Sequence, residues 1–296
     1  MGTDVLDGYY SEQRSLRRIA LAELAAETGA RTTMVGFSFN GEPKATCVEA
    51  MRNLPPQVQL CCRDPFSLAR VERWAERPAR LVADAAFLLE PATGSELVSL
   101  VSQWVRVQRL DSRIVVGINA NSLLLRKGVL AGSDQVASIY GRGLTEVFSR
   151  NGHLSFLLMP HDFRGAINEI SLMAAIWEAL PPEVRDRSLV PPTPFSAAEA
   201  KAMCTELDLV FTGRMHLAIA ALSQGIPACC VSYQDKMEGL FRHFELDGMT
   251  IMPDQVVQPG VLADFLIGMI EERSEYQERI RARLPKIRRL AQANYD

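Results

Sequence analysis

The residues best suited to chemistry lie in one stretch, residues 208–236, which reads DLVFTGRMHLAIAALSQGIPACCVSYQDK. Arg214 and His216 follow an apolar run and a Thr-Gly break, where a strand pattern gives way to a helix pattern. An arginine clamps anions through its planar fork of donors, and a histidine transfers protons near neutral pH. We therefore expect this Arg-x-His pair to bind a phosphate or carboxylate group and to act on its carrier as an acid or base.

The same stretch predicts a strand, a helix and a second strand. Residues 209–211 and 228–231 are short apolar runs typical of buried parallel strands. An Ala-rich helix lies between these two runs, and Gly225 and Pro227 mark its end. In open α/β sheets, ligands bind beyond the carboxyl ends of the strands, and a helix that begins there attracts anions. The Arg-x-His pair therefore lies at a favourable place for a ligand.

Polar or charged side chains follow other apolar runs as well. These are Arg63, Asn119, His161, Tyr233 and Lys236. The carboxyl ends of parallel strands share one edge of a sheet. We therefore expect these side chains in the second half of the chain to gather near the Arg-x-His pair. Structural roles stay open for three of them. Arg63 can form a local ion pair with Asp64, His161 can bond to loop backbone, and Lys236 can be a solvated helix start.

The rest of the chain alternates between helix and strand patterns, which is typical of α/β proteins with parallel sheets. The expected strands span residues 32–37, 58–62, 79–82, 114–118, 153–159, 188–190, 209–211, 228–231 and 250–252. The expected helices span residues 11–29, 44–53, 67–74, the first part of 91–112, 134–150, 168–180, 196–205, 216–225 and 237–244, followed by a long helix from about residue 261 that is kinked at Pro285.

A dense run of mixed charge suggests a domain boundary near residue 110, giving domains of residues 1–110 and 111–296. The last helix either folds back on the first domain or pairs with a partner.

Composition excludes several classes of protein. The 296 residues are 48% hydrophobic and 23% charged, with a net charge of -3, which argues against nucleic acid as a partner. No apolar run approaches a membrane span, and the first residues do not resemble a signal peptide, so we expect a cytoplasmic protein. The six cysteines include two adjacent pairs within apolar runs, where neighbours point to opposite faces. We interpret all six as reduced core residues.

Other chemistries lack their motifs. The chain has no GxGxxG after its first strand pattern and no GxxxxGK[ST], which removes the usual signals for dinucleotide and P-loop sites. It has no HExxH and no GxSxG, so we expect no metal site and no hydrolase nucleophile elbow.

Taken together, these segments resemble the polysaccharide pyruvyl transferase family. The family's core signature is a strand, Thr-Gly-Arg-x-His, an Ala-rich helix, Gly-x-Pro, a strand and Tyr-x-x-Lys. Here it reads FTGRMH, LAIAALSQGIP and ACCVSYQDK. Upstream, CCRDPFSLARV, VADAAFLLEP and FLLMPHD resemble three further segments of the family. The resemblance covers most of residues 1–245.

The resemblance implies a fold of two Rossmann-like domains that face each other across a cleft, as in GT-B glycosyltransferases. It implies transfer of pyruvate from phosphoenolpyruvate to a sugar, forming a ketal across two hydroxyls, with phosphoenolpyruvate as co-substrate and no cofactor. The acceptor would be a sugar or lipid-linked oligosaccharide of a cell-surface polysaccharide or exopolysaccharide, with peripheral membrane association through that acceptor. The first domain would hold the acceptor and the second the donor.

Carried over by motif, Arg214 would clamp the phosphate or carboxylate of the donor, and His216 would give or take a proton. Gly213 and the backbone of Met215 would assist at the helix N-terminus. His161 would be a second acid or base that faces the acceptor. The remaining substrate-binding positions would be Arg63, Asn119, Tyr233 and Lys236.

The sequence also departs from the family pattern. Relatives carry a strand and a Gly-rich turn at the start, which this chain lacks, so we expect a shortened first domain. Asn119 stands where relatives often have an arginine, so that anion contact is either absent or supplied by Arg126. Two alternatives follow, a GT-B glycosyltransferase that uses a nucleotide sugar and a non-catalytic relic of either enzyme.

Overall fold

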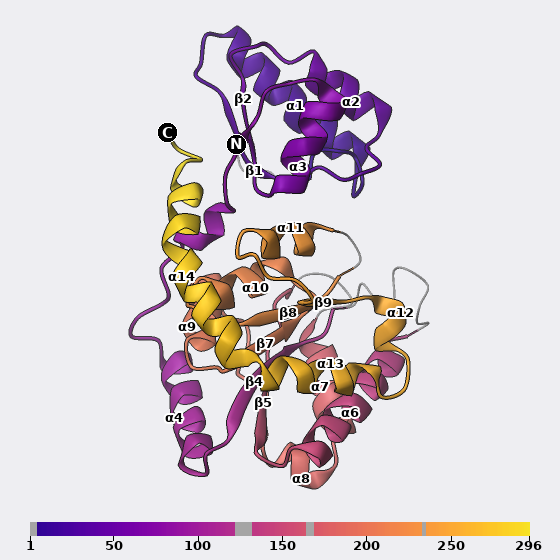
Figure 1. Ribbon diagram of the computed structural model, residues 1–296, viewed down its shortest axis with the longest axis vertical. Coiled ribbons are helices and arrows are strands. Elements are labelled where there is room, and N and C mark those ends of the chain that lie inside the picture. Colours follow the sequence, from indigo (N-terminus) through magenta and orange to yellow (C-terminus); the bar gives the residue numbers. More distant parts are fainter. Residues whose placement is uncertain (1–4, 122–131, 164–168, 233–234) are drawn as a thin grey trace. The chain divides into compact units, whose positions relative to one another are not determined.

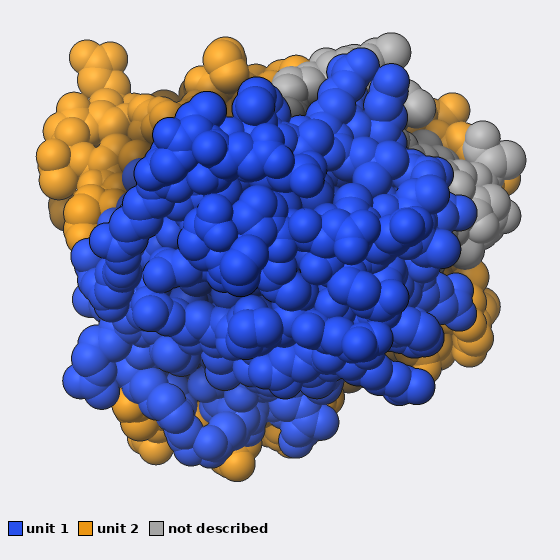
Figure 2. Space-filling view, turned by 90° about the horizontal axis from the view of Figure 1, so that it is seen from above, with its two compact units in different colours: residues 1–89, 234–247, 283–296 blue, residues 90–233, 248–282 orange. Residues whose placement is uncertain are grey.

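The computed structural model describes residues 5–121, 132–163, 169–232 and 235–296. The chain forms two compact units, coloured separately in Figure 2. Unit 1 consists of residues 1–89, 234–247 and 283–296, and unit 2 of residues 90–233 and 248–282. This division differs from the expected boundary near residue 110. Helix α4 (Glu96–Leu110) belongs to unit 2 because it packs on α9 and β4 of that unit, while two later segments return to unit 1.

Unit 1 is built on a three-stranded parallel sheet in the order β1-β2-β3. Its elements are α1 (Glu12–Glu27), β1 (Thr33–Phe37), α2 (Ala45–Arg52), β2 (Gln59–Cys62), α3 (Pro65–Arg70), a π-helical turn η1 (Val71–Ala75), β3 (Arg80–Leu81), a 3-10 turn η2 (Ala85–Leu88) and α11 (Lys236–Arg242). Ile19, Met34, Phe37 and Met51 form its core with other fully buried apolar side chains. Ahead of α1, Val5 forms a parallel bridge with Ser38 beyond β1.

Unit 2 contains a six-stranded parallel sheet in the order β6-β5-β4-β7-β8-β9 (Figure 1). Its strands are β4 (Ile114–Asn119), β5 (Leu154–Leu158), β6 (Ser188–Leu189), β7 (Leu209–Thr212), β8 (Ala228–Val231) and β9 (Thr250–Ile251). Its helices, besides α4, are α6 (Ser133–Arg150), α7 (Glu169–Ala179), α8 (Pro182–Arg185), α9 (Ala197–Cys204), α10 (Met215–Leu222), α12 (Pro253–Val256) and α13 (Val261–Glu271).

The strands of unit 2 are apolar because helices cover the sheet. β5 is buried along its whole length, as is typical of parallel strands between helical layers. Helices α6, α7 and α13 pack as one group, and α4, α9 and α10 pack as another (Figure 1). Right-handed crossovers place helices on opposite faces when the strand order reverses, and here it reverses between β4 and β7. This order is that of the doubly wound Rossmann fold.

The structure confirms the nine predicted strands and their parallel pairing. It also confirms that Gly225 follows the end of α10, with a positive φ of 75° that glycine adopts without strain. Ser196 caps α9 as expected and forms a capping box with Glu199. All six cysteines are buried.

The long C-terminal helix differs from its prediction. The break falls at Glu272, between α13 and α14 (Arg273–Gln292), and Pro285 lies inside α14. A proline inside a helix removes one hydrogen bond and costs about 3 kcal/mol, so packing must hold it. Ile280 and Ile287, which are buried on either side of Pro285, supply that packing. The second half of α14 belongs to unit 1.

Across the described ranges, every helix falls short of the length or the apolar character needed to cross a membrane.

Candidate functional site

The carboxyl ends of β4 and β7 meet at the reversal point of the unit 2 sheet, where Asn119 pairs in register with Thr212. Both residues are fully buried. The Thr212 hydroxyl donates to Asn119 Oδ1 at 2.9 Å and accepts from the Arg214 backbone N–H at 2.9 Å. One hydroxyl therefore connects the two strand ends and fixes the turn that carries Arg214.

Glu169, the first residue of α7, is the centre of the polar contacts at this edge. Its side chain is fully buried. Its Oε2 accepts from Asn119 Nδ2 at 2.7 Å and from the backbone N–H groups of His161 and Asp162 at 2.7 and 3.2 Å. Its Oε1 accepts from Arg214 Nε at 2.5 Å. One carboxylate thus holds the ends of β4 and β5 and the turn after β7.

Arg214 is less available to an anion than the sequence predicts. Its Nε faces Glu169, and its Nη2 lies 3.4 Å from Asp162 Oδ2, while 24% of its side chain is exposed. Two of its three guanidinium nitrogens therefore face carboxylates. One positive and two negative charges leave the cluster with a formal charge of about -1, so any bound anion needs further donors nearby.

Neighbouring side chains in the turn after β7 differ in their burial. Met215 is 7% exposed and anchors α10, whereas His216, the next residue, is exposed. Gly213 is required by a close approach, since a Cβ there would lie 2.6 Å from the Asn121 Cβ. Asn121 Nδ2 also donates to the Gly213 carbonyl at 2.9 Å. Asn121 thus packs against the turn and bonds to it, while His216, in the first turn of α10, is exposed.

The structure brings three of the predicted positions, Asn119, His161 and Arg214, onto Glu169. Gly213 precedes Arg214 in the same turn and bonds to Asn121. His161 enters through its backbone N–H, and its side chain is half-buried. Asn119 uses its amide for buried contacts, which is a structural role. Tyr233 and Arg126 lie outside the described residues.

Sequence reasoning missed Glu169 and Thr212. Thr212 was predicted only as a break after the strand, although it is the last residue of β7. Glu169 was predicted only as part of a helix over residues 168–180. A glutamate in the first turn of a helix is ordinary, and no local signal indicated that this one is buried.

Arg63 belongs to a buried network in unit 1. It is 3% exposed, its Nε donates to Ser38 Oγ at 2.8 Å, and its Nη1 lies 3.0 Å from Asp84 Oδ2. Asp64, the neighbour considered as its partner, instead caps α3 by accepting from the Ser67 N–H at 2.8 Å. Arg63 therefore joins the segments after β1, β2 and β3, and a contact with substrate stays a prediction.

The carbonyl of Arg63 has a partner as well. His243, which follows α11, lies with its Nε2 2.8 Å from that oxygen. Burial lowers the pKa of His243, so the neutral ring donates this hydrogen bond. The network therefore ties residues 234–247 to the sheet of unit 1.

Lys236 begins α11 and also lies in unit 1, rather than in the second domain where the sequence placed it. Its Nζ donates to Tyr10 Oη at 2.9 Å and lies 5.3 Å from the centre of the Tyr10 ring. The adjacent Asp235 pairs with Arg70, with Arg70 Nη1 3.0 Å from Asp235 Oδ1. Lys236 is thus a tethered cation beside an exposed tyrosine.

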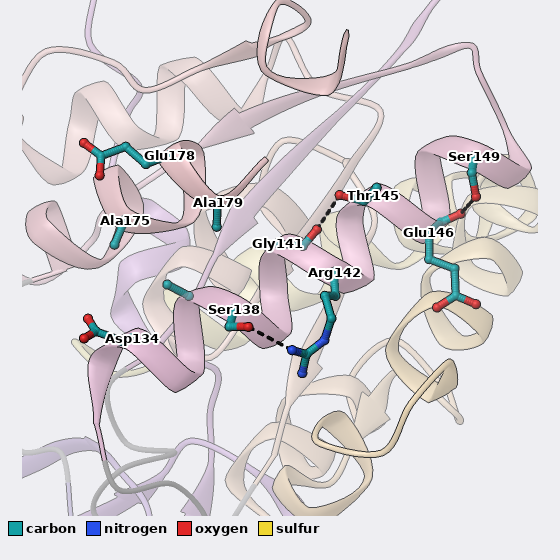
Figure 3. A pocket seen from close by; sticks show the side chains of 11 residues that line it. Asp134, Ser138, Gly141, Arg142, Thr145, Glu146, Ser149, Ala175, Glu178 and Ala179 are labelled. Carbon is teal, nitrogen blue, oxygen red and sulfur yellow. Dashed lines mark hydrogen bonds between the residues drawn. The ribbon is translucent and has the colours of Figure 1, made fainter. Parts of the chain in front are cut away.

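A groove of about 550 Å³ runs along α6 and α7 (Figure 3). Small side chains line much of it, including Ala137 and Gly141 on α6 and Ala175 and Ala179 on α7. The helices approach closely, since a Cβ on Gly141 would lie 2.9 Å from the Ala179 Cβ. No residue of the Glu169 cluster lines this groove, and the described side chains include no group of three or more His, Cys, Asp or Glu that could hold a metal ion.

A profile of the family described as "Polysaccharide pyruvyl transferase" matches residues 2–235, most of the chain. This chain belongs to the polysaccharide pyruvyl transferase family. The match includes the Thr-Gly-Arg-x-His turn and the strands that flank it. Curated proteins offer no relative of significant similarity.

Similar solved structures agree on the fold. The N-terminal domain of Candida albicans trehalose-6-phosphate phosphatase has a TM-score of 0.55 at 10% identity, over 98% of this chain and 67% of that one. A UDP-forming α,α-trehalose-phosphate synthase from Burkholderia xenovorans, in complex with glucose-6-phosphate, has a TM-score of 0.55 at 11% identity, over 93% and 69%.

A putative UDP-N-acetylglucosamine 2-epimerase from Listeria monocytogenes has a TM-score of 0.51 at 11% identity, over 90% of this chain and 74% of that one. At such low identities these likenesses show the fold alone. They confirm the predicted class, an α/β protein with the Rossmann-like units of GT-B glycosyltransferases and epimerases.

Glu169→Gln should destabilise the protein, because the ion pair with Arg214 and the other charge-assisted hydrogen bonds of the carboxylate are lost or weakened. We expect a loss of about 1.5–3 kcal/mol, measured by urea unfolding followed by circular dichroism. Glu178→Gln, an exposed change on the same helix, is the matched control and should stay within about 0.5 kcal/mol of wild type. Equal effects of the two changes would contradict the role given to Glu169.

Arg63→Met should be costly because it leaves the Asp84 carboxylate buried without its cation. We expect a loss of about 3–5 kcal/mol in the free energy of unfolding. Arg52→Met breaks an exposed ion pair with Glu76 in the same unit and should cost less than about 1 kcal/mol. If Arg63→Met is as mild as Arg52→Met, the network does not support unit 1.

Proposed function

We propose that this protein transfers the pyruvyl group of phosphoenolpyruvate to two hydroxyls of one sugar in a cell-surface polysaccharide or its precursor. The products are a pyruvate ketal and inorganic phosphate, and phosphoenolpyruvate is a co-substrate rather than a cofactor. One observation carries the proposal. A member of this family presents the exposed His216 directly beyond Arg214, at the reversal point of a Rossmann-like sheet.

The start of α10 is the proposed anion site. Helices begin with backbone N–H groups that have no partner within the helix, and these groups favour negative charge. α10 begins at Met215, and no side chain caps it at Arg214. We assign the Met215 backbone N–H, together with Arg214, as the donors to the phosphate or carboxylate of phosphoenolpyruvate. The backbone N–H adds a hydrogen-bond donor to those of the guanidinium, which already lies beside Glu169 and Asp162.

His216 is the proposed acid for the first step. Protonation of the enol carbon C3 converts it to a methyl group and makes C2 electrophilic. A sugar hydroxyl then adds to C2 and gives up its proton, and the C2–O bond to phosphate breaks with its electron pair on phosphate. A second hydroxyl adds to the resulting cationic C2, closes the ketal and gives up its proton to the departed phosphate. An imidazole suits the first transfer because its ordinary pKa lies near neutrality.

His161 is the proposed base for the acceptor hydroxyl. Glu169 fixes its backbone N–H at 2.7 Å, and its side chain is half-buried at the end of β5. The same carboxylate therefore positions both His161 and Arg214. A base and an anion donor held by one buried group keep a constant spacing, which suits two successive additions at C2.

Phosphoenolpyruvate should raise the melting temperature of the purified protein more than equal concentrations of inorganic phosphate or uridine diphosphate. At 100 times the dissociation constant, binding adds about 2.7 kcal/mol to the free energy of unfolding. Arg214→Ala should abolish the shift, whereas Arg142→Ala, a change on α6, should keep it. A shift with uridine diphosphate alone would favour a nucleotide-sugar glycosyltransferase, and no shift with any ligand would favour a non-catalytic relic.

His216→Asn should lower the rate of phosphate release, measured with a panel of sugar acceptors, by about 100-fold or more, since general acid catalysis contributes 10²–10⁴. The affinity for phosphoenolpyruvate should change little, because the imidazole acts on carbon rather than on the phosphate. His153→Asn, at an exposed position before β5, serves as the control. Normal turnover in His216→Asn would remove His216 as the acid.

A further inference from the structure

The segment that precedes α1 is fixed to unit 1 by its backbone. The bridge between Val5 and Ser38 places it beyond the carboxyl end of β1. The Lys44 backbone N–H donates to the Asp7 carbonyl at 2.8 Å. Gly8 follows with a φ of 84°, and a Cβ there would lie 2.8 Å from Lys44 Cγ. The segment therefore has a defined course at this edge of the unit 1 sheet.

The carboxylate of Asp7 joins this segment to the loop after β1. Asp7 is 1% exposed. Its Oδ1 accepts from the Tyr9 backbone N–H at 2.8 Å, and its Oδ2 accepts from the Asn40 backbone N–H at 2.6 Å. Because both donors meet one carboxylate, Tyr9 and Asn40 are held close together at the edge where ligands of parallel sheets bind.

The side-chain amide of Asn40 is buried with a donor unused. Asn40 is 9% exposed, and across the part of the chain that the structure describes its Nδ2 has no hydrogen-bond partner. A buried donor without a partner is costly, so such a group in a native protein calls for an explanation. An oxygen of a ligand bound at this edge would supply the partner.

Two tyrosines follow Gly8 directly. Tyr9 and Tyr10 are each about half exposed, and their ring centres lie 5.2 Å apart with the ring planes at 88°. The Lys236 ammonium donates to the Tyr10 hydroxyl and so ties that ring to α11. The pair is thus an ordered aromatic surface next to the loop that carries Asn40.

Exposed rings beside a neutral amide donor suit a sugar. A pyranose has apolar C–H groups on its faces and hydroxyls around its rim, so it can stack on a tyrosine ring and accept a hydrogen bond at the same time. The charges that hold these segments also balance. Arg70, which donates to the Phe39 carbonyl, pairs with Asp235, and Lys236 offsets Asp7. This balance gives no preference for an anion.

We propose that unit 1 binds a neutral pyranose at this place, with the sugar stacked on the Tyr9 ring and one of its hydroxyls accepting from the Asn40 amide. Tyr9 is chosen over Tyr10 because Lys236 already lies over the Tyr10 ring. The identity of this sugar as the pyruvyl acceptor rests on the proposed function. Tyr9 and Asn40 are then positioning residues, which orient the acceptor and take no part in bond making.

Saturation-transfer difference NMR on the full chain tests sugar binding without turnover. The probes are methyl β-D-glucopyranoside, methyl β-D-galactopyranoside and methyl α-D-mannopyranoside. Wild type should transfer saturation to the ring C–H protons of at least one of them. Tyr9→Ala should raise the dissociation constant of that glycoside about fivefold or more, because the stacking surface is lost. Tyr295→Ala, which removes an exposed tyrosine elsewhere in unit 1, should leave it unchanged.

Circular dichroism shows that both variants fold. Three results would overturn the sugar site: no transfer to any glycoside, equal affinity in Tyr9→Ala and wild type, or transfer to the base protons of uridine diphosphate in place of the glycosides.

Asn40→Leu separates ligand binding from a structural role of the amide. Removing a buried donor that has no partner should leave the free energy of unfolding unchanged or raise it, while the dissociation constant of the glycoside rises about fivefold or more. Asn53→Leu, at an exposed position after α2, is the control and should bind the glycoside as wild type does. Wild-type affinity in Asn40→Leu removes Asn40 from the site, whatever the stability of the variant.

The sugar site and the proposed reaction fail separately. With phosphoenolpyruvate and an accepted sugar, Tyr9→Ala should raise the KM for the sugar with a smaller change in kcat, and it should keep the thermal shift with phosphoenolpyruvate. A lower kcat at unchanged KM would overturn the positioning role. A wild type that binds a glycoside through Tyr9 but releases no phosphate from phosphoenolpyruvate would remove the proposed reaction and leave the sugar site supported.

Discussion

The buried carboxylate of Glu169 is the interaction on which the candidate site depends. A charge without water is costly unless donors surround it, and here four N–H groups from three separate segments do so. Because those donors come from the ends of β4 and β5 and from the turn after β7, the carboxylate can be satisfied only when all three are in place. The requirement to pair one charge thus fixes the geometry of the sheet edge.

In each unit one buried charged side chain holds the strand ends together, and the two charges have opposite signs. In unit 2 a buried anion, Glu169, gathers the strand ends. In unit 1 a buried cation, Arg63, does so through Ser38 and Asp84. In both, polar atoms hold the backbone at the edge where ligands of parallel sheets bind. Beside the Glu169 network His216 is exposed, and the proposed reaction uses this side chain as its acid.

Much of the fold could be predicted because its signals are local. An apolar run, a Thr-Gly break and a glycine after the helix indicated β7, α10 and the turn between them. Glu169 could not be found in this way, since its partners Asn119 and Arg214 lie 50 and 45 residues away and meet it only in the folded sheet. Arg63 shows the same limit. The neighbouring Asp64 suggested a local pair, but the chain pairs Arg63 with Asp84 across the sheet. The return of residues 234–247 and 283–296 to unit 1 likewise depends on tertiary packing.

The most direct test of this account is a crystal structure of the protein with phosphoenolpyruvate. The account predicts electron density for the ligand beyond the carboxyl ends of β4 and β7. One of its anionic groups should lie within hydrogen-bond distance of the Met215 backbone N–H and of Arg214, with C3 beside His216 and the Glu169 contacts intact. Phosphoenolpyruvate bound elsewhere, such as in the groove between α6 and α7, with the start of α10 empty, would contradict it.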